Sequence, residues 1–370
     1  MYKNLLRPLL FRLDPELAHD FTLDWLSRAG RLPPLLSLLR RIYGDKVPDL
    51  PVEVMGITFP VPLGLAAGLD KGACCISALS TFGFGHLELG TVTPQPQPGN
   101  PPPRMFRLPE HQAIINRMGF NSAGIRPFLE NIANTHKQIP LGINLGKNAK
   151  TPIAQAADDY ISGLRQLYLY ADYFTINISS PNTRNLRDLQ SEDALDDLLG
   201  QIMNVRQELA EEFRRQVPVA IKIAPDLAND SFGVLAELFI KHKVDAVIAT
   251  NTTIDHSAVA DNDLADEAGG LSGRPLKDRA NEVVGLLYRE LQGRIPIIGV
   301  GGIFSAEDAW QRIVSGAEMV QIYTGFIYNG PAVVKEIVSG LAARVSESGA
   351  NTLQEAAAIA RQEHAANKKQ

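Results

Sequence analysis

Short apolar runs recur along the chain from residue 47 onward, and a helical pattern usually follows each one. The runs are rich in Val, Ile and Leu and do not alternate with polar residues, which is typical of strands covered on both faces. Amphipathic stretches such as 158–170 and 306–316 predict helices between them. The predicted strands lie within residues 62–68, 85–93, 141–147, 173–182, 218–226, 246–252, 295–303 and 319–325.

This alternation of strand and helix implies parallel strands joined by right-handed crossovers. Eight such units over residues 47–345 predict a closed (β/α)₈ TIM barrel, with an open doubly wound sheet as the alternative. Two insertions interrupt the pattern. Residues 52–59 predict a hairpin before the first barrel strand, and the proline-rich stretch 94–103 leads into a second hairpin above the barrel.

The first 46 residues form a separate, small helical extension. Leucines and aromatic residues recur there at near-helical spacing, and Asp14-Pro15 predicts the start of a helix that ends at Gly30. The segment carries eight basic and five acidic residues, whereas the whole chain has a net charge of −5. Such helices can lie in a membrane interface or pack on the barrel, and the pattern alone favours packing. The tail 346–370 is a frayed helix or disorder, with no assigned function.

Composition and charge exclude several classes. With 45% hydrophobic and 21% charged residues among 370, most of the chain is expected to be globular. The negative net charge disfavours nucleic-acid binding. No stretch approaches the roughly 20 apolar residues of a spanning helix, and no signal peptide is evident. The two cysteines, Cys74 and Cys75, are adjacent and indicate a reducing compartment, not a disulfide scaffold.

Polar residues gather where the predicted strands end, which is where barrel enzymes place their active sites. They comprise amides, hydroxyls and two lysines, without a histidine or a carboxylate pair. Glycines in GVGGI (299–303) and YTG (323–325) follow strands seven and eight, so their backbone amides can approach a phosphate. Lys222, on an apolar strand, needs a negative partner: a structural ion pair or a cofactor that becomes anionic on reduction.

Other motifs are less decisive. NISSPN (177–182) alone favours a capped turn, although its amides could bind a planar ligand and its serine, if activated, could take a proton. There is no HExxH, CxxC pair, P-loop or strand-linked GxGxxG, so no metal is expected.

Ten ordered motifs over residues 1–340 carry a specific resemblance. They include LGLAAGLDK (63–71), GTVTPQPQPGN (90–100), INRMGFN (115–121), GINLGKN (142–148), NISSPNT (177–183), VAIKIAPDL (219–227), IATNTT (248–253), GGLSGRPL (269–276), IIGVGGI (297–303) and VQIYTGF (320–326). Together they resemble dihydroorotate dehydrogenase. The serine in NISSPN and the amino-terminal LDPELAH helices are similar to the membrane-associated, quinone-dependent class. LDKGACC departs from the usual Asp-Lys-Asp-Gly, which leaves the geometry of that loop open.

The resemblance implies oxidation of (S)-dihydroorotate to orotate in pyrimidine biosynthesis, with hydride transfer to FMN and reoxidation by a membrane quinone. Ser180 would be the catalytic base, and His19 and Arg107 would lie near the quinone head. The implied FMN contacts are Ala67, Gly68, Leu69, Asp70, Lys71, Thr91, Asn144, Asn177, Lys222, Thr250, Gly273, Gly302, Tyr323 and Thr324. The implied substrate contacts are Lys71, Asn116, Arg117, Met118, Gly119, Phe120, Asn177, Asn182, Asn251 and Thr252.

The expected protein is a monomer, held peripherally at the cytoplasmic face of a bacterial inner membrane. Two other functions stay open at this point. One is a soluble flavin barrel that uses fumarate or a nicotinamide partner as electron acceptor. The other is a catalytically silent barrel that binds a phosphate ligand and docks to membranes.

Overall fold

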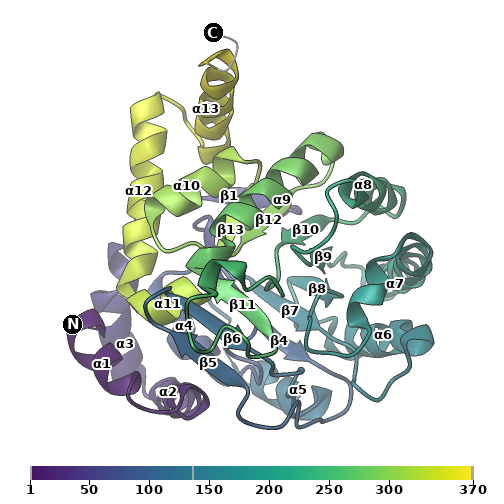
Figure 1. Ribbon diagram of the computed structural model, residues 1–370, viewed down its shortest axis with the longest axis horizontal. Helices are drawn as coiled ribbons and strands as arrows, with labels where there is room; N and C mark the ends of the chain where they lie inside the picture. Colours follow the sequence, from purple (N-terminus) through teal and green to yellow (C-terminus); the bar gives the residue numbers. More distant parts are fainter. Residues whose placement is uncertain (1, 136, 368–370) are drawn as a thin grey trace.

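The computed structural model describes residues 2–135 and 137–367, and its centre is a closed barrel of eight parallel strands (Figure 1). The order around the barrel is β3, β4, β7, β8, β9, β10, β12 and β13, which closes back on β3. Their bounds are Leu63–Leu65, Leu87–Val92, Leu141–Leu145, Tyr173–Asn177, Val219–Ile223, Ala246–Ala249, Ile297–Val300 and Met319–Ile322. The predicted TIM barrel and all eight predicted strands are therefore confirmed, and the open sheet is wrong.

Helices surround the barrel (Figure 1). Their buried apolar side chains belong to the same core cluster as those of the strands. Every residue of the eight barrel strands is buried, which is why these segments do not alternate in polarity. The surrounding helices are α4 (Ile76–Leu79), α5 (Ile125–Ala133), α6 (Ala156–Leu167), α7 (Glu192–Phe213), α8 (Ser231–Lys241), α9 (Lys277–Leu291), α10 (Ala306–Val314), α11 (Thr324–Asn329) and α12 (Ala332–Ser348).

Two smaller sheets flank the barrel. Strands β1 (Val52–Val54) and β2 (Ile57–Phe59) form the first predicted hairpin. Strands β5 (Met105–Leu108) and β6 (Ala113–Asn116) form the second, and β11 (Gly270–Gly273) pairs with β6 to complete a three-stranded sheet. Both hairpins are confirmed. Sequence reasoning missed β11, because its glycines are typical of a turn and its partner lies more than 150 residues away.

The amino-terminal extension contains α1 (Arg7–Leu10), α2 (Pro15–Ala29) and α3 (Pro33–Ile42). Asp14 caps α2 by accepting hydrogen bonds from the amides of Glu16 and Leu17, and Gly30 ends it, as predicted. The helices touch the body through a few buried side chains such as Leu26 and Leu39.

Most of the large apolar side chains of this extension point away from the barrel. Packing on the body therefore accounts for only part of their hydrophobicity. Within residues 2–135 and 137–367, no helix has the length and apolarity to cross a membrane. The exposed side chains are Leu5, Leu6, Leu9, Leu13, Leu17, Phe21, Trp25, Leu32, Leu38 and Ile42, a set that we call the apolar face.

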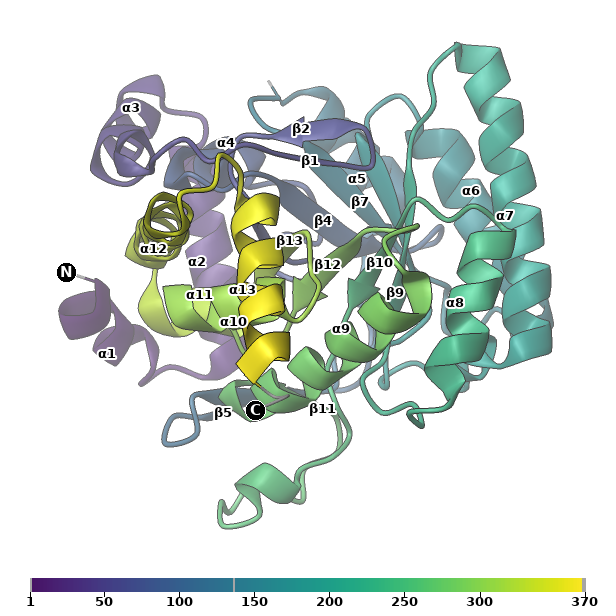
Figure 2. The same cartoon turned by 90° about the horizontal axis from the view of Figure 1, so that it is seen from above.

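The carboxy-terminal segment forms a packed helix, α13 (Leu353–Asn367), beside α10 and α12 (Figure 2). Leu353, Ala356 and Ala357 are buried against the body. Arg361 donates to the carbonyl of Ile313 at 3.1 Å, and its guanidinium lies 5.0 Å from the centre of the Tyr288 ring. The packed side of α13 is thus neither frayed nor disordered.

Candidate active site

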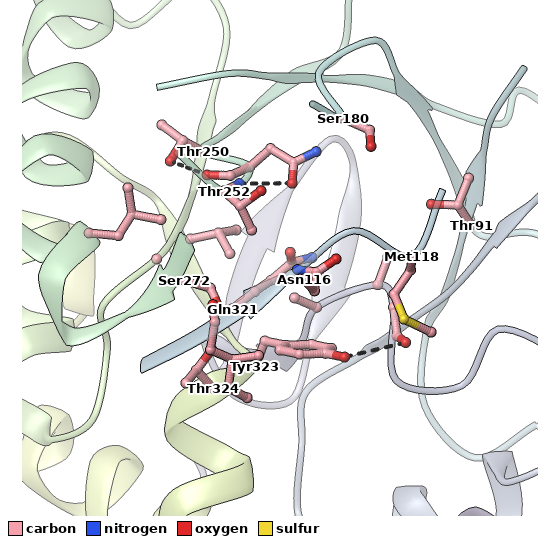
Figure 3. Close-up of a pocket in the computed structure, with 18 of the residues that line it drawn as sticks. Thr91, Asn116, Met118, Ser180, Thr250, Thr252, Ser272, Gln321, Tyr323 and Thr324 are labelled. Atoms are coloured by element: carbon pink, nitrogen blue, oxygen red, sulfur yellow. Dashed lines mark hydrogen bonds between the residues drawn. The ribbon is translucent and has the colours of Figure 1, made fainter. Parts of the chain in front are cut away.

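A cavity opens at the carboxyl ends of the barrel strands (Figure 3). The sheet of β5, β6 and β11 forms part of its wall through Met105, Ile114 and Ser272. Its empty volume is about 1120 Å³, which includes the open mouth. Among the described residues that line it, two are lysines, Lys71 and Lys222, and none is acidic. The cavity therefore suits an anionic ligand.

Most of the residues predicted to bind ligands meet in this cavity. Six of them lie outside its lining: Leu69, Asp70, Asn144, Arg117, His19 and Arg107. The structure thus brings together predicted residues from nine separate segments of the chain, as the convergence of strand ends predicts. Those that line it are Ala67, Gly68, Lys71, Thr91, Asn116, Met118, Gly119, Phe120, Asn177, Ser180, Asn182, Lys222, Thr250, Asn251, Thr252, Gly273, Gly302, Tyr323 and Thr324.

One end of the cavity is walled by glycine backbone. Gly302 has a φ of +71°, and a Cβ built there would lie 2.4 Å from the Cα of Lys277, so only glycine fits. Gly273 is restricted in the same way, with a φ of +104°. The hydroxyls of Ser272 and Thr324 lie 2.9 Å apart beside them. Backbone amides and hydroxyls without a nearby carboxylate are the groups that bind phosphate.

The floor of the cavity contains a buried ion pair. Lys222 Nζ lies 3.8 Å from Glu88 Oε1, and the Glu88 carboxylate accepts hydrogen bonds from Asn144 Nδ2 and Gln321 Nε2, both at 2.7 Å, and from the Tyr173 hydroxyl at 3.3 Å. The structural ion pair considered from the sequence thus exists, and Lys222 also faces the cavity. Sequence reasoning missed Glu88, because an acid inside the strand GHLELG gives no sign of its partner.

Interlocked amides form a second wall. Asn144 Oδ1 accepts from the Thr91 hydroxyl at 2.6 Å and from Asn177 Nδ2 at 3.2 Å, so Asn144 lies behind the lining and orients it. Asn251 Nδ2 donates to the Ser179 hydroxyl at 3.0 Å. The side chains of NISSPN therefore both stabilise a turn and present amides to the cavity.

Lys71 lies at the other end of the cavity, where its Nζ donates to Asn121 Oδ1 at 2.8 Å. Burial, reinforced by the positive charge of Arg104, lowers the pKa of Lys71 to about 8. Asn121 was missed as a site residue, although it ends the motif INRMGFN.

Ser180 is buried in the cavity wall, and its hydroxyl oxygen accepts from the amide of Asn182 at 3.2 Å. No hydrogen bond between described residues joins this hydroxyl to a histidine or a carboxylate. Among the described residues, the hydrogen bond from the Asn182 amide therefore fixes the orientation of this hydroxyl in the cavity wall.

The remaining predicted residues have other surroundings. Asp70 is buried and accepts from the amides of Cys74 and Cys75, and Arg117 forms an ion pair with Glu267 at 2.6 Å. Leu69 is part of the buried core.

His19 and Arg107 lie where the extension meets the body. Burial is the main reason that the pKa of His19, on α2, falls to about 4, so its imidazole is neutral at pH 7. Arg107, on β5, donates to the carbonyls of Leu10 and Leu13 and stacks 4.6 Å from the centre of the Phe11 ring. Arg107 thus holds the link between α1 and α2 on the sheet.

A TIM barrel with a cationic, amide-lined cavity and a glycine wall defines a class of barrel enzymes that bind phosphate-bearing ligands. Within that class, the family model for dihydroorotate dehydrogenase matches residues 49–345. The chain belongs to the dihydroorotate dehydrogenase family, whose members are flavin-dependent oxidoreductases.

Relatives of known name agree with this assignment. The chain is 53% identical to dihydroorotate dehydrogenase (quinone) of Cronobacter sakazakii, over 92% of this chain and 100% of that one. It is 52% identical to the enzyme of the same name from Methylococcus capsulatus, over 91% and 98% of the two chains. The dihydroorotate dehydrogenase of Eimeria tenella in complex with ferulenol superposes with a TM-score of 0.84 at 37% identity, covering 93% of this chain and 94% of that one.

Proposed function

We propose that this chain oxidises (S)-dihydroorotate to orotate, with FMN in the barrel cavity as hydride acceptor and a membrane quinone as the final electron acceptor. One observation carries the proposal: a single cavity joins a glycine-walled end and Lys222 to a second lysine, Lys71, among asparagines. The first end suits a phosphate-bearing cofactor, and the second suits a small planar carboxylate.

The residues present fit FMN. The glycine backbone at 273 and 302 and the Thr324 hydroxyl would hold its phosphate. Gln321 lines the cavity, and its Oε1 is buried without a hydrogen-bond partner among the described residues, so it can accept from a ligand. When bound, FMN would supply the hydride acceptor that no amino-acid side chain provides.

The asparagine-rich end would position the substrate. Lys71 would offset the substrate carboxylate, while Asn177, Asn182 and Asn251 hold the ring by its amide edges. Ser180 would then take the proton from C5 as the hydride leaves C6. Positioning of this kind contributes several kcal/mol in enzymes, and a placed base contributes about 10²- to 10⁴-fold in rate.

The apolar face supports a route for the quinone. Its leucines and aromatic residues would insert into one leaflet of a membrane, so that the extension associates peripherally. His19 and Arg107 would contact the quinone head. In this arrangement residues 1–46 give access to membrane and quinone, residues 47–345 form the flavin barrel, and 346–370 form the tail. The enzyme would act as a monomer on the cytoplasmic face of the bacterial inner membrane.

Anaerobic spectroscopy of the purified protein tests the proposal. The protein should be yellow, dihydroorotate should bleach it, and a long-tailed quinone should restore the colour. A colourless protein, or a flavin that dihydroorotate does not reduce, would contradict the oxidation itself. Reoxidation by fumarate or by a nicotinamide partner, in place of the quinone, would contradict only the proposed acceptor.

A further inference from the structure

The loop after β3 brings three potential metal ligands together beside the cavity. Asp70, Cys74 and Cys75 each offer one donor atom, and these atoms lie within 4.8 Å of one another. Both cysteines of the chain are in this cluster. The spacing of these three residues in the sequence matches no metal-binding motif. Asp70 lies beside the two sulfurs because the loop turns back on itself.

Two of the three distances between donor atoms match the edges of a tetrahedral site, and all three are within 4.8 Å. Cys74 Sγ lies 3.7 Å from Cys75 Sγ and 3.4 Å from Asp70 Oδ1. A tetrahedral zinc ion with bonds of about 2.3 Å to sulfur and about 2.0 Å to oxygen separates two sulfurs by about 3.8 Å and a sulfur from an oxygen by about 3.5 Å. The two edges at Cys74 Sγ therefore already have the length that a cation of this size requires.

The surrounding backbone fixes the carboxylate against the thiols. Asp70 Oδ1 accepts from the amide of Cys74 at 2.9 Å, and Oδ2 accepts from the amide of Cys75 at 2.8 Å. Ala73, with a φ of +56°, turns the chain back between them. Hydrogen bonds that orient ligands in this way are a regular feature of metal sites. Cys74 is exposed, so solvent can supply the fourth ligand and the cation can enter.

A disulfide between the two cysteines does not fit this loop. Neighbouring Cα atoms across a trans peptide lie about 3.8 Å apart, shorter than the usual 4.4–6.8 Å span of a disulfide. The two thiols therefore stay available as separate ligands.

We propose that Asp70, Cys74 and Cys75 bind a thiophilic divalent cation of the zinc and cadmium class, with solvent as the fourth ligand. Binding forms two metal–sulfur bonds and releases both thiol protons to water, so the affinity rises with pH. The hydrogen bond from Cys75 Sγ to the carbonyl of Leu23 on α2, 3.3 Å long, is given up. None of the three ligands takes part in the proposed reaction. Lys71, which would bind the substrate, directly follows Asp70 in the sequence.

Cadmium titration of the holoenzyme tests the site, because cadmium thiolates absorb in the ultraviolet and the chain has no other cysteine. We expect a difference band that saturates at one cadmium per chain and is absent in C74S. C75S should also lose the band. Cys74 is exposed, so C74S alone decides the test if the buried substitution prevents folding. D70N should weaken binding at least about tenfold.

A matched control variant removes a potential metal ligand elsewhere on the protein. His242 Nε2 and Asp196 Oδ1, which lie 2.6 Å apart, offer an imidazole and a carboxylate but no sulfur. H242Q should keep the band and the stoichiometry of the wild type. No band in the wild type, a band that persists in C74S, or saturation at half a cadmium per chain would each overturn the proposal. The last result would mean that two chains share the ion.

Discussion

Replacing Lys222 with methionine tests the buried ion pair on which the cavity floor depends. Methionine keeps much of the length of the lysine but removes its charge, which leaves the Glu88 carboxylate buried beside an apolar group. Coulomb's law for unit charges 3.8 Å apart gives about 4 kcal/mol at an effective dielectric of about 20. Breaking a buried pair typically costs about 3–5 kcal/mol. K222M should therefore lower the free energy of unfolding by roughly that amount.

Lys222 would also contact FMN, so the loss of bound cofactor could lower stability by itself. A double-mutant cycle with E88Q separates the two effects, because K222M and K222M/E88Q both lack the lysine. E88Q should destabilise the wild type but stabilise the K222M protein, since in K222M it removes an unpaired charge.

The assay is equilibrium urea unfolding of all four proteins at equal FMN concentration. R165M is the matched control, because Arg165 and Glu208 form an exposed pair at 2.8 Å that should contribute at most about 1 kcal/mol. If K222M costs no more than R165M, or if E88Q destabilises both backgrounds equally, the buried pair does not act as described.

The remaining predictions concern the reaction. S180A should slow single-turnover flavin reduction about 10²- to 10⁴-fold while FMN stays bound; an unchanged rate excludes Ser180 as the base. Because the lowered pKa of Lys71 is about 8, its positive charge is present below that pH and lost above it, so kcat/KM for dihydroorotate should fall above about pH 8. K71R should keep the charge and move this fall upward; an identical profile would contradict the assignment. Deleting residues 1–40 should preserve flavin reduction by dihydroorotate but abolish turnover with a long-tailed quinone, and intact turnover would discard the proposed route. Because Asp70 directly precedes Lys71, cadmium bound at the proposed site should inhibit the wild type more than C74S. Equal inhibition of the two proteins would mean that cadmium inhibits at a different site.

Local pattern was enough to predict much of the fold. Barrel strands buried on both faces are mostly apolar, so all eight appear as short runs rich in Val, Ile and Leu. Helix α2 could be delimited because both ends carry a local signal: a capping aspartate and a first-turn proline at the start, and a glycine directly after the last residue. The convergence of strand-end residues on one cavity follows from barrel geometry alone.

Contacts across long sequence intervals could not be predicted. Glu88 and Lys222 are 134 positions apart along the chain, and nothing near either residue indicates the other. Strand β11 exists because β6 offers it an edge, although its glycines favour a turn. The tail lacked a clear pattern, yet α13 packs because Leu353 and two alanines find a surface on the body.

By itself, the sequence determined the barrel, the order and approximate positions of its strands, and the chemical types of residue that meet at its mouth, because these depend on local periodicity and on one rule of topology. Only the tertiary structure decided which face of the amino-terminal helices stays exposed, which acid pairs with Lys222, and that Asp70 lies beside two thiols. Those features depend on distances between segments, and distances are set by the packing of the whole chain.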